Sequence, residues 1–174
     1  DYLALLTITP SSHPQTFRLL HAASLIASFV VLRFKEQYQR ARPSHVCPAL
    51  KPPIQVPGHA SFPSGHATQA HLMRRCLVRL FQIVEAEGGP LDDDDINMYR
   101  QNLRILAKRV ARNREIAGLH YHSDSDAGNA LADILVNVLF SDDHRIGRFR
   151  TIVCKAVTEW GADPIDDFED PGDE

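Results

Sequence analysis

The sequence has few of the residues that would point to several common classes of protein. Its three cysteines are widely spaced and form no CxxC pair, so neither a disulfide framework nor a zinc ribbon is indicated. Aromatic residues make up only 7% of the chain and no separate basic patch accompanies them, which argues against nucleic-acid binding. The longest apolar run, residues 19–32, is shorter than the roughly 20 residues that span a bilayer. We therefore expect this run to form a buried core helix of a soluble protein without a membrane span.

Charge is distributed unevenly along the 174 residues. Residues 159–174 hold eight acidic residues and no Lys or Arg, whereas the rest of the chain holds 14 acidic and 19 basic ones. We interpret residues 1–160 as a single helical domain and residues 161–174 as an acidic C-terminal tail. A cationic body suits an anionic substrate, although the same charge split could serve solubility alone. The chain shows no signal-peptide pattern and begins with Asp rather than Met, so the compartment stays open, as does the oligomeric state.

Apolar residues recur at helical spacing, and no segment alternates convincingly with the period of a strand. The pattern therefore predicts an all-α helical bundle. Pro43 should stop the first helix near Arg42, because the residue before a proline is pushed away from helical angles. The second helix should bury a stripe of Leu72, Cys76, Leu80 and Val84, and Gly118 should end the third. For the fourth helix we expect Ser123 as the N-cap, with a buried stripe of Ala127, Leu131, Ile134 and Val138. The predicted helices cover residues 15–41, begin at 64, 92 and 123, and end with a shorter helix over 145–158, with a proline-rich connection over 43–63.

Three short motifs carry cations and histidines, and the first is Lys35 followed by Arg42 and Pro43. Seven residues are nearly two helical turns, so both cations project from one face. Many solvated helices show the same pairing, and alone this motif carries little weight.

The second motif, Ser64-Gly65-His66, opens a helix. The unpaired N–H groups of a helix N-terminus receive anions readily. Ser64 adds a hydroxyl, Gly65 lets an oxyanion approach the backbone, and His66 can move protons near neutral pH. A serine N-cap beside an incidental histidine explains this motif equally well when it is taken alone.

The third motif contains Arg114, His120 and Asp124. A carboxylate on one ring nitrogen fixes the tautomer and makes the other nitrogen a better nucleophile or ligand. The planar fork of donors on Arg114 suits phosphate-like oxygens. Taken alone, the motif could be a surface histidine paired with a helix-capping aspartate.

Together the three motifs resemble the signature of the type 2 phosphatidic acid phosphatase and vanadium-dependent haloperoxidase superfamily. Every charged or histidine position of that signature is filled over residues 35–124, and the one departure is Asn113, where a serine is usual. The resemblance implies a helical bundle of the acid phosphatase/vanadium haloperoxidase type with a cavity for tetrahedral phosphate or vanadate. The residues it implies for holding that group are Lys35, Arg42, Ser64, Gly65 and Arg114.

The resemblance also implies roles for the histidines. In the phosphatase branch, His120 is the nucleophile that forms a phosphohistidine, Asp124 orients it, and His66 protonates the leaving oxygen and then activates water. The substrate is a small phosphorylated compound, and no metal or other cofactor is needed because fixed cations stabilise the developing charge.

In the haloperoxidase branch, the same pocket holds vanadate through His120 and oxidises a halide with hydrogen peroxide. His59 resembles an additional active-site histidine of some bromoperoxidases and favours this branch, although phosphatases without a metal can also carry a histidine there. The short chain favours the phosphatase. We therefore expect a phosphatase that works without a metal, with a vanadate-dependent haloperoxidase as the alternative.

Overall fold

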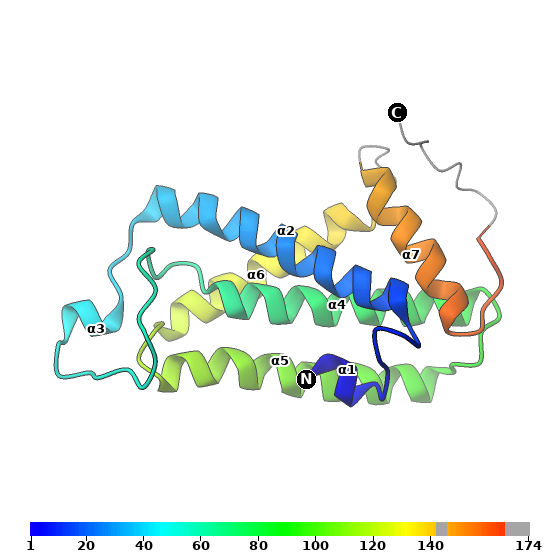
Figure 1. Ribbon diagram of the computed structural model, residues 1–174, viewed down its shortest axis with the longest axis horizontal. Coiled ribbons are helices and arrows are strands. Elements are labelled where there is room, and N and C mark those ends of the chain that lie inside the picture. Colours follow the sequence, from blue (N-terminus) through cyan, green and yellow to red (C-terminus); the bar gives the residue numbers. More distant parts are fainter. Residues whose placement is uncertain (142–145, 166–174) are drawn as a thin grey trace.

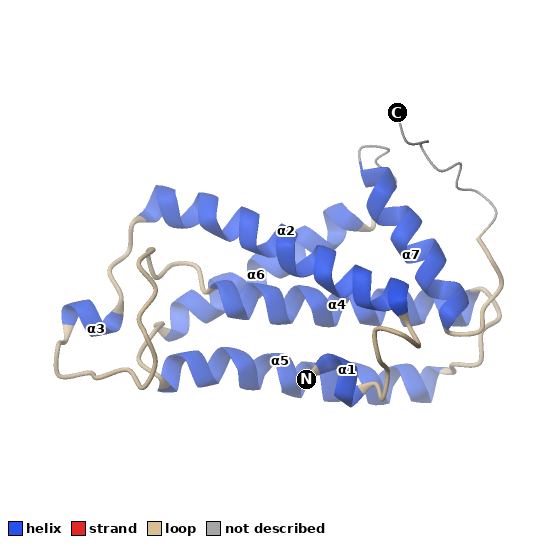
Figure 2. Cartoon of the chain, in the orientation of Figure 1, coloured by secondary structure: helices blue, strands red, loops and turns tan. Residues whose placement is uncertain are grey.

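The computed structural model in Figure 1 describes residues 1–141 and 146–165. Over these residues every regular element is a helix (Figure 2), which confirms the predicted all-α fold class. The helices are α1 (Tyr2–Leu5), α2 (Pro14–Tyr38), α3 (Pro43–Val46), α4 (Gly65–Ala86), α5 (Asp93–Ile116), α6 (His122–Leu139) and α7 (Gly147–Glu159).

Helix α4 is the centre of the bundle, because α2, α5, α6 and α7 all pack against it. Its predicted apolar stripe is confirmed, since Leu72, Cys76, Leu80 and Val84 are all fully buried. Burying such side chains stabilises a fold by about 1.5–3 kcal/mol each, so this stripe is a main source of stability. The core therefore holds α4 in place, and with it the helix start that carries the second motif.

Helix α2 ends earlier than predicted. Its last residue is Tyr38, and Gln39 then adopts a left-handed conformation with φ of 46°. The prediction of a stop near Arg42 is therefore wrong by about one turn. The consequence is that Arg40 and Arg42 lie beyond the helix, in the connection that follows, and Arg42 has extended backbone.

Helix α6 begins one residue before the predicted cap. Tyr121 is the N-cap, and the carboxylate of Asp124 accepts its N–H at 3.0 Å, so Ser123 lies inside the first turn. The predicted stripe is also wrong at two positions, because Ile134 is 61% and Val138 52% exposed. The residues of α6 that are buried against the bundle instead include Gly128, Ala132, Val136 and Leu139.

The reason for this rotation is a close approach between α6 and the start of α4. A Cβ on Gly128 would lie 2.8 Å from the carbonyl oxygen of Ser64 and 2.9 Å from Oγ1 of Thr68. Only glycine allows the two backbones to lie this close. The contact fixes the start of α4, which carries the second motif, against the helix that carries Asp124 of the third.

The apolar run of α2 is less buried than expected. The segment Pro14–Val46 contains an 18-residue stretch with a mean hydropathy of 1.6, and 28% of that stretch is buried. By length and composition the segment could cross a membrane. Length and composition are weak evidence, because core helices of soluble proteins and signal sequences meet the same criteria. Leu25, Phe29 and Leu32 are 50–70% exposed, so the expectation of a buried core helix is correct only for one face.

The end of the described chain packs against the bundle beyond residue 160. Ala162 is buried, and the N–H of Asp163 donates to the carbonyl of Glu87 at 3.3 Å. The remainder of the predicted acidic tail, residues 166–174, lies outside the described residues.

Candidate active site

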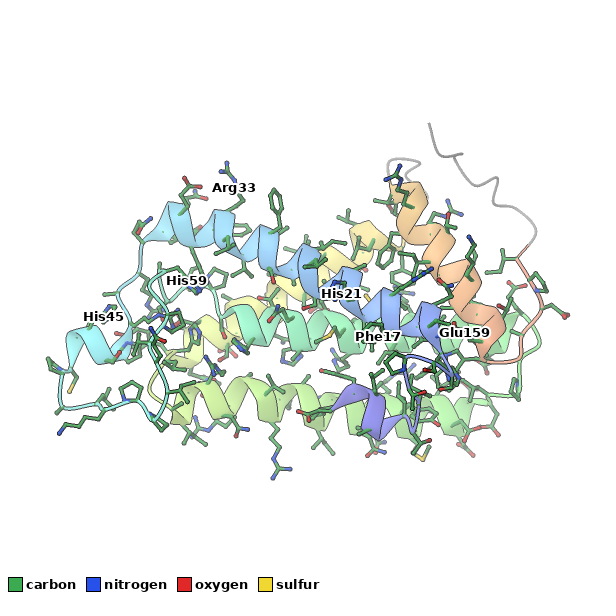
Figure 3. All side chains as sticks on the ribbon, viewed as in Figure 1. Phe17, His21, Arg33, His45, His59 and Glu159 are labelled. Atoms are coloured by element: carbon green, nitrogen blue, oxygen red, sulfur yellow. The ribbon has the colours of Figure 1, made fainter. Side chains whose placement is uncertain are left out.

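One end of the bundle gathers the three motifs. The C-terminal ends of α2 and α5 and the N-terminal ends of α4 and α6 meet there with the connection between α2 and α4 (Figure 1). Figure 3 shows His59 at this end, beneath the last part of α2. A cavity of about 310 Å³ lies among these segments, and its lining includes Lys35, Arg42, His59, Gly65, His66, Arg114 and His120. The remaining wall of the cavity includes Ser28, Val31, Leu32, Pro57 and Gln69.

His120 and Asp124 form a buried pair. They are 5% and 0% exposed, and Nδ1 of His120 lies 3.3 Å from Oδ2 of Asp124. An ionised carboxylate can only accept, so Nδ1 must carry the proton and Nε2 keeps its lone pair. Nε2 lies 3.5 Å from Nη1 of Arg42. A guanidinium can only donate, so Nε2 is the acceptor in this contact. Burial, opposed by the hydrogen bond to Asp124, lowers the pKa of His120 and keeps the imidazole neutral.

The carboxylate of Asp124 has donors besides His120. Oδ2 accepts from Oγ of Ser61 and from the N–H of Tyr121, while Oδ1 accepts from Nη1 of Arg40 at 2.7 Å. Burial raises the pKa of Asp124, but the hydrogen bonds and the charge of Arg40 outweigh it, and the net pKa is lowered. Asp124 is therefore ionised near neutral pH.

Two of those donors, Arg40 and Ser61, were missed from the sequence. Arg40 lies inside the six-residue spacer of the first motif, and Ser61 is separated from Asp124 by 63 residues. The only sign of Arg40 in the sequence was that it is a third cation, between Lys35 and Arg42. Nothing in the spacing pointed to Ser61.

Lys35 is 3% exposed and holds the connection in place. Its Nζ donates to the carbonyl oxygens of Ala60 and Ser61 at 2.7 and 2.8 Å. Burial, together with the charge of Arg42, lowers the pKa of Lys35 to about 8. An ammonium has three donors, so one remains to reach a ligand in the cavity.

Arg42 is 1% exposed and joins two segments that are distant in sequence. Its Nε donates to the carbonyl of His59 at 3.1 Å and its Nη1 to the carbonyl of Leu119 at 2.8 Å. Its Nη2 lies 3.2 Å from Nδ1 of His59. Arg42 therefore fixes both His59 and the residue before His120 around one guanidinium.

Arg114 enters the cavity from the last turn of α5. Its Nε is buried without a hydrogen-bond partner among the described residues, and burial lowers its pKa. A buried donor without a partner costs about 1–3 kcal/mol, which an anion in the cavity would offset. Asn113, at the position where the signature has serine, is exposed.

The start of α4 contributes Gly65 and His66 to the cavity. Ser64 is fully buried, and its Oγ accepts the N–H of Ala67 at 3.4 Å as an N-cap. Its own N–H donates to the carbonyl of Asp124 at 2.9 Å. Ser64 thus ties the start of α4 to the helix that carries Asp124.

His66 lies among positively charged side chains of the cavity. Partial burial, followed by the charges of Arg114 and the other cations of the cavity, lowers the pKa of His66 to about 4. His66 is therefore neutral at neutral pH when the cavity holds no anion. A bound anion compensates the cations and raises this pKa toward the range of a proton donor.

The fold and the site define an all-α protein with a cationic cavity built around a His–Asp pair. Two curated proteins are similar to it, both named decaprenylphosphoryl-5-phosphoribose phosphatase, from Mycobacterium tuberculosis strains CDC 1551 / Oshkosh and ATCC 25618 / H37Rv. Each is 30% identical over 110 residues, which are 63% of this chain and 51% of the relative. The chain therefore spans about half the length of the curated relatives it matches. No protein-family model matches the sequence.

Proposed function

We propose that the protein is a phosphoric-ester hydrolase that works through a phosphohistidine on His120. The observation that carries this proposal is the unprotonated Nε2 of His120, which lies in one cavity with Lys35, Arg42 and Arg114. A nucleophile among fixed cations is the arrangement that phosphoryl transfer requires, because its catalysis depends on positioning and electrostatics. Similarity to two named phosphatases supports the same class of reaction.

In the first step, Nε2 of His120 attacks phosphorus and forms an N–P bond. The P–O bond to the leaving group breaks, and the leaving oxygen takes a proton from His66. His66 is neutral in the free cavity, and the charge of the bound phosphate raises its pKa so that it can hold this proton. Asp124 accepts from Nδ1 and stabilises the imidazolium that forms.

In the second step, water attacks the phosphohistidine. His66 takes a proton from the water, the N–P bond breaks with its electron pair returning to Nε2 of His120, and phosphate leaves. Lys35, Arg42, Arg114 and the N–H groups at the start of α4 stabilise the oxygens of both transition states. We propose that these fixed charges suffice without a metal ion.

The cavity wall suggests a substrate with an apolar part. Val31 and Leu32 of α2 line the cavity, and Leu32, Phe29 and Leu25 continue along the exposed face of that helix. The relatives are named for a decaprenyl-linked phosphosugar. We propose a phosphate monoester whose apolar group lies along this face of α2, in place of the small phosphorylated compound expected from the sequence.

The vanadate-dependent haloperoxidase remains the second candidate, and the position of His59 favours it. His59 lines the same cavity, next to Arg42. The donor set fits vanadate, because His120 offers Nε2 and the cations match a tetrahedral oxyanion. Bound vanadate would supply the activation of hydrogen peroxide for halide oxidation.

A paired assay tests the two candidates. Hydrolysis of p-nitrophenyl phosphate is measured with and without vanadate, and halide oxidation by hydrogen peroxide is measured with vanadate added. The phosphatase predicts hydrolysis that vanadate inhibits, and the haloperoxidase predicts halide oxidation that requires vanadate. Turnover should fall on the order of a thousandfold or more in His120→Ala. His122 is an exposed neighbour, and His122→Ala is the control that should keep normal turnover. Near-normal hydrolysis by His120→Ala would contradict a mechanism through phosphohistidine.

A further inference from the structure

We propose that Arg40 is a positioning residue that sets the charge state and the orientation of His120 by acting through Asp124. This inference rests on the proposed function, in which the free Nε2 of His120 is the nucleophile. None of the three sequence motifs includes Arg40 as a functional residue.

The side-chain contacts of Arg40 lie at the start of α6, and its backbone carbonyl accepts the N–H of Ser61 at 2.8 Å. Its Nη1 donates to Oδ1 of Asp124 at 2.7 Å and to Oγ of Ser123 at 2.8 Å. Its guanidinium lies 4.1 Å from the centre of the Tyr121 ring, a cation–π contact. Arg40 thus holds three residues of one helix start from the end of α2, more than 80 residues away in sequence.

Arg40 and His120 bind opposite oxygens of one carboxylate. Oδ1 accepts from Arg40, whereas Oδ2 is shared by Ser61, the N–H of Tyr121 and His120. At 3.3 Å the contact to His120 is the longest of these hydrogen bonds to Asp124. Without Arg40 the carboxylate loses its only donor on Oδ1 among the described residues, and its plane is free to rotate away from Nδ1.

The charges are arranged so that Arg40 also controls the proton on His120. Asp124 is fully buried, while the side chain of Arg40 is 38% exposed. A buried carboxylate with no compensating charge would stabilise the imidazolium of His120 and so remove the free Nε2. The guanidinium offsets part of that effect, and it adds to the burial and the charges of Arg42 and Lys35 that lower the pKa of His120.

Other charged groups face His120 from every element around it. They are Lys35 from α2, Arg42 and His59 from the connection, His66 from α4, Arg114 from α5 and Asp124 from α6. Apart from Asp124 these groups are cationic or neutral, and they line the cavity where the substrate binds. Arg40 differs from them, because it acts on the carboxylate and not on the cavity.

The test is the titration of the His120 imidazole, followed by NMR in the free protein and assigned by comparison with His120→Gln. Arg40→Gln should move the titration upward by about one pH unit, the size expected for the loss of one nearby charge. Arg40→Lys, which keeps the charge, should stay closer to the wild type. Arg33→Gln, which removes an exposed arginine of α2 paired with Glu36, is the matched control and should leave the titration unchanged.

Activity provides a second readout. In Arg40→Gln the acid limb of kcat/KM should shift to higher pH with the His120 titration, so that the loss is about tenfold on the acid side and smaller above neutral pH. In the Asp124→Asn background the Arg40 substitution should have almost no further effect, because the two residues act in series. Arg40→Met, whose stem still covers Tyr121, replaces Arg40→Gln if that variant does not fold.

An unchanged His120 titration in a folded Arg40→Gln or Arg40→Met protein overturns the proposal, whatever happens to activity. A loss of activity that is equal at all pH values, with no shift of the limb, also overturns it and indicates a merely structural role. If the wild type hydrolyses no phosphate ester, the proposed function fails, but the NMR titration still decides the role of Arg40.

Discussion

At each end of the bundle a carboxylate accepts hydrogen bonds at a helix start, from within the same helix at one end and from a distant part of the chain at the other. At the site end this is Asp124, which binds Arg40, Ser61, His120 and the N–H of Tyr121. At the opposite end Glu159 accepts the N–H of Gln15 and Thr16 and the hydroxyl of Thr16, at the start of α2. Figure 3 shows Glu159 at the far end of the molecule from His59.

The difference lies in the donors. The donors to Glu159 are uncharged backbone and hydroxyl groups. Aromatic packing completes this end, where the ring centroids of Trp160 and Phe81 lie 4.8 Å apart. Those of Asp124 include a guanidinium and a titratable imidazole. A carboxylate that caps a helix through neutral donors contributes stability. A carboxylate hydrogen-bonded to an imidazole beside a cavity also orients a titratable group, which is the basis of the proposed reaction.

The largest effect should come from Asp124→Asn. The amide keeps the shape but favours the wrong tautomer of His120, so kcat/KM for p-nitrophenyl phosphate should fall by about 10³–10⁴. Steady-state kinetics and a thermal melt measured together separate lost chemistry from lost folding. Asp124→Asn with more than a tenth of normal turnover would contradict the assignment of Asp124.

Removing Arg114 should weaken anion binding. In Arg114→Ala the cavity loses charge-assisted hydrogen bonds worth about 1.5–3 kcal/mol, so phosphate affinity should fall about 10- to 150-fold. Isothermal titration with inorganic phosphate measures this. Arg112→Ala, on the same helix but exposed and paired with Glu115, is the control. Equal affinities in the two variants would show that Arg114 does not hold the anion.

At the opposite end, Glu159→Gln should act on stability alone. Loss of this cap should lower the free energy of unfolding by about 1–2 kcal/mol, as measured by urea denaturation. Because Glu159 lies far from the cavity, kcat and KM should stay within about twofold of the wild type. A large drop in turnover by the folded variant would break the contrast between the two ends.

The smallest effect should be a pH dependence of anion binding at the site end. Lys35 has a pKa lowered to about 8, so its ammonium loses its proton above that pH in the free protein. A bound anion favours the charged ammonium, and phosphate affinity should therefore decline as pH rises, by up to about tenfold between pH 7 and pH 9. The decline should be smaller in Lys35→Arg, because a guanidinium keeps its proton. Equal slopes in both proteins would assign the effect to another group.

Much of the fold was predictable because it depends on local spacing. The buried stripe of α4, the caps Ser64 and Asp92, and the left-handed Gly118 at the end of α5 follow from periodicity and capping chemistry. The errors at Ile134 and Val138 arose because the rotation of α6 is set by its contact at Gly128. Spacing within α6 carries no information on what packs against it.

The sequence by itself determined which residue types the site contains, since the three motifs supply the histidines, the cations and Asp124, and the structure brings them to one end of the bundle. Only the tertiary structure decided how the carboxylate at the centre of that end is held. Arg40 and Ser61 reach Asp124 from 84 and 63 residues away, and Arg42 reaches Leu119 from 77. The physical reason is that a buried charge must find its partners in three dimensions, and no local pattern records which distant donors will meet it.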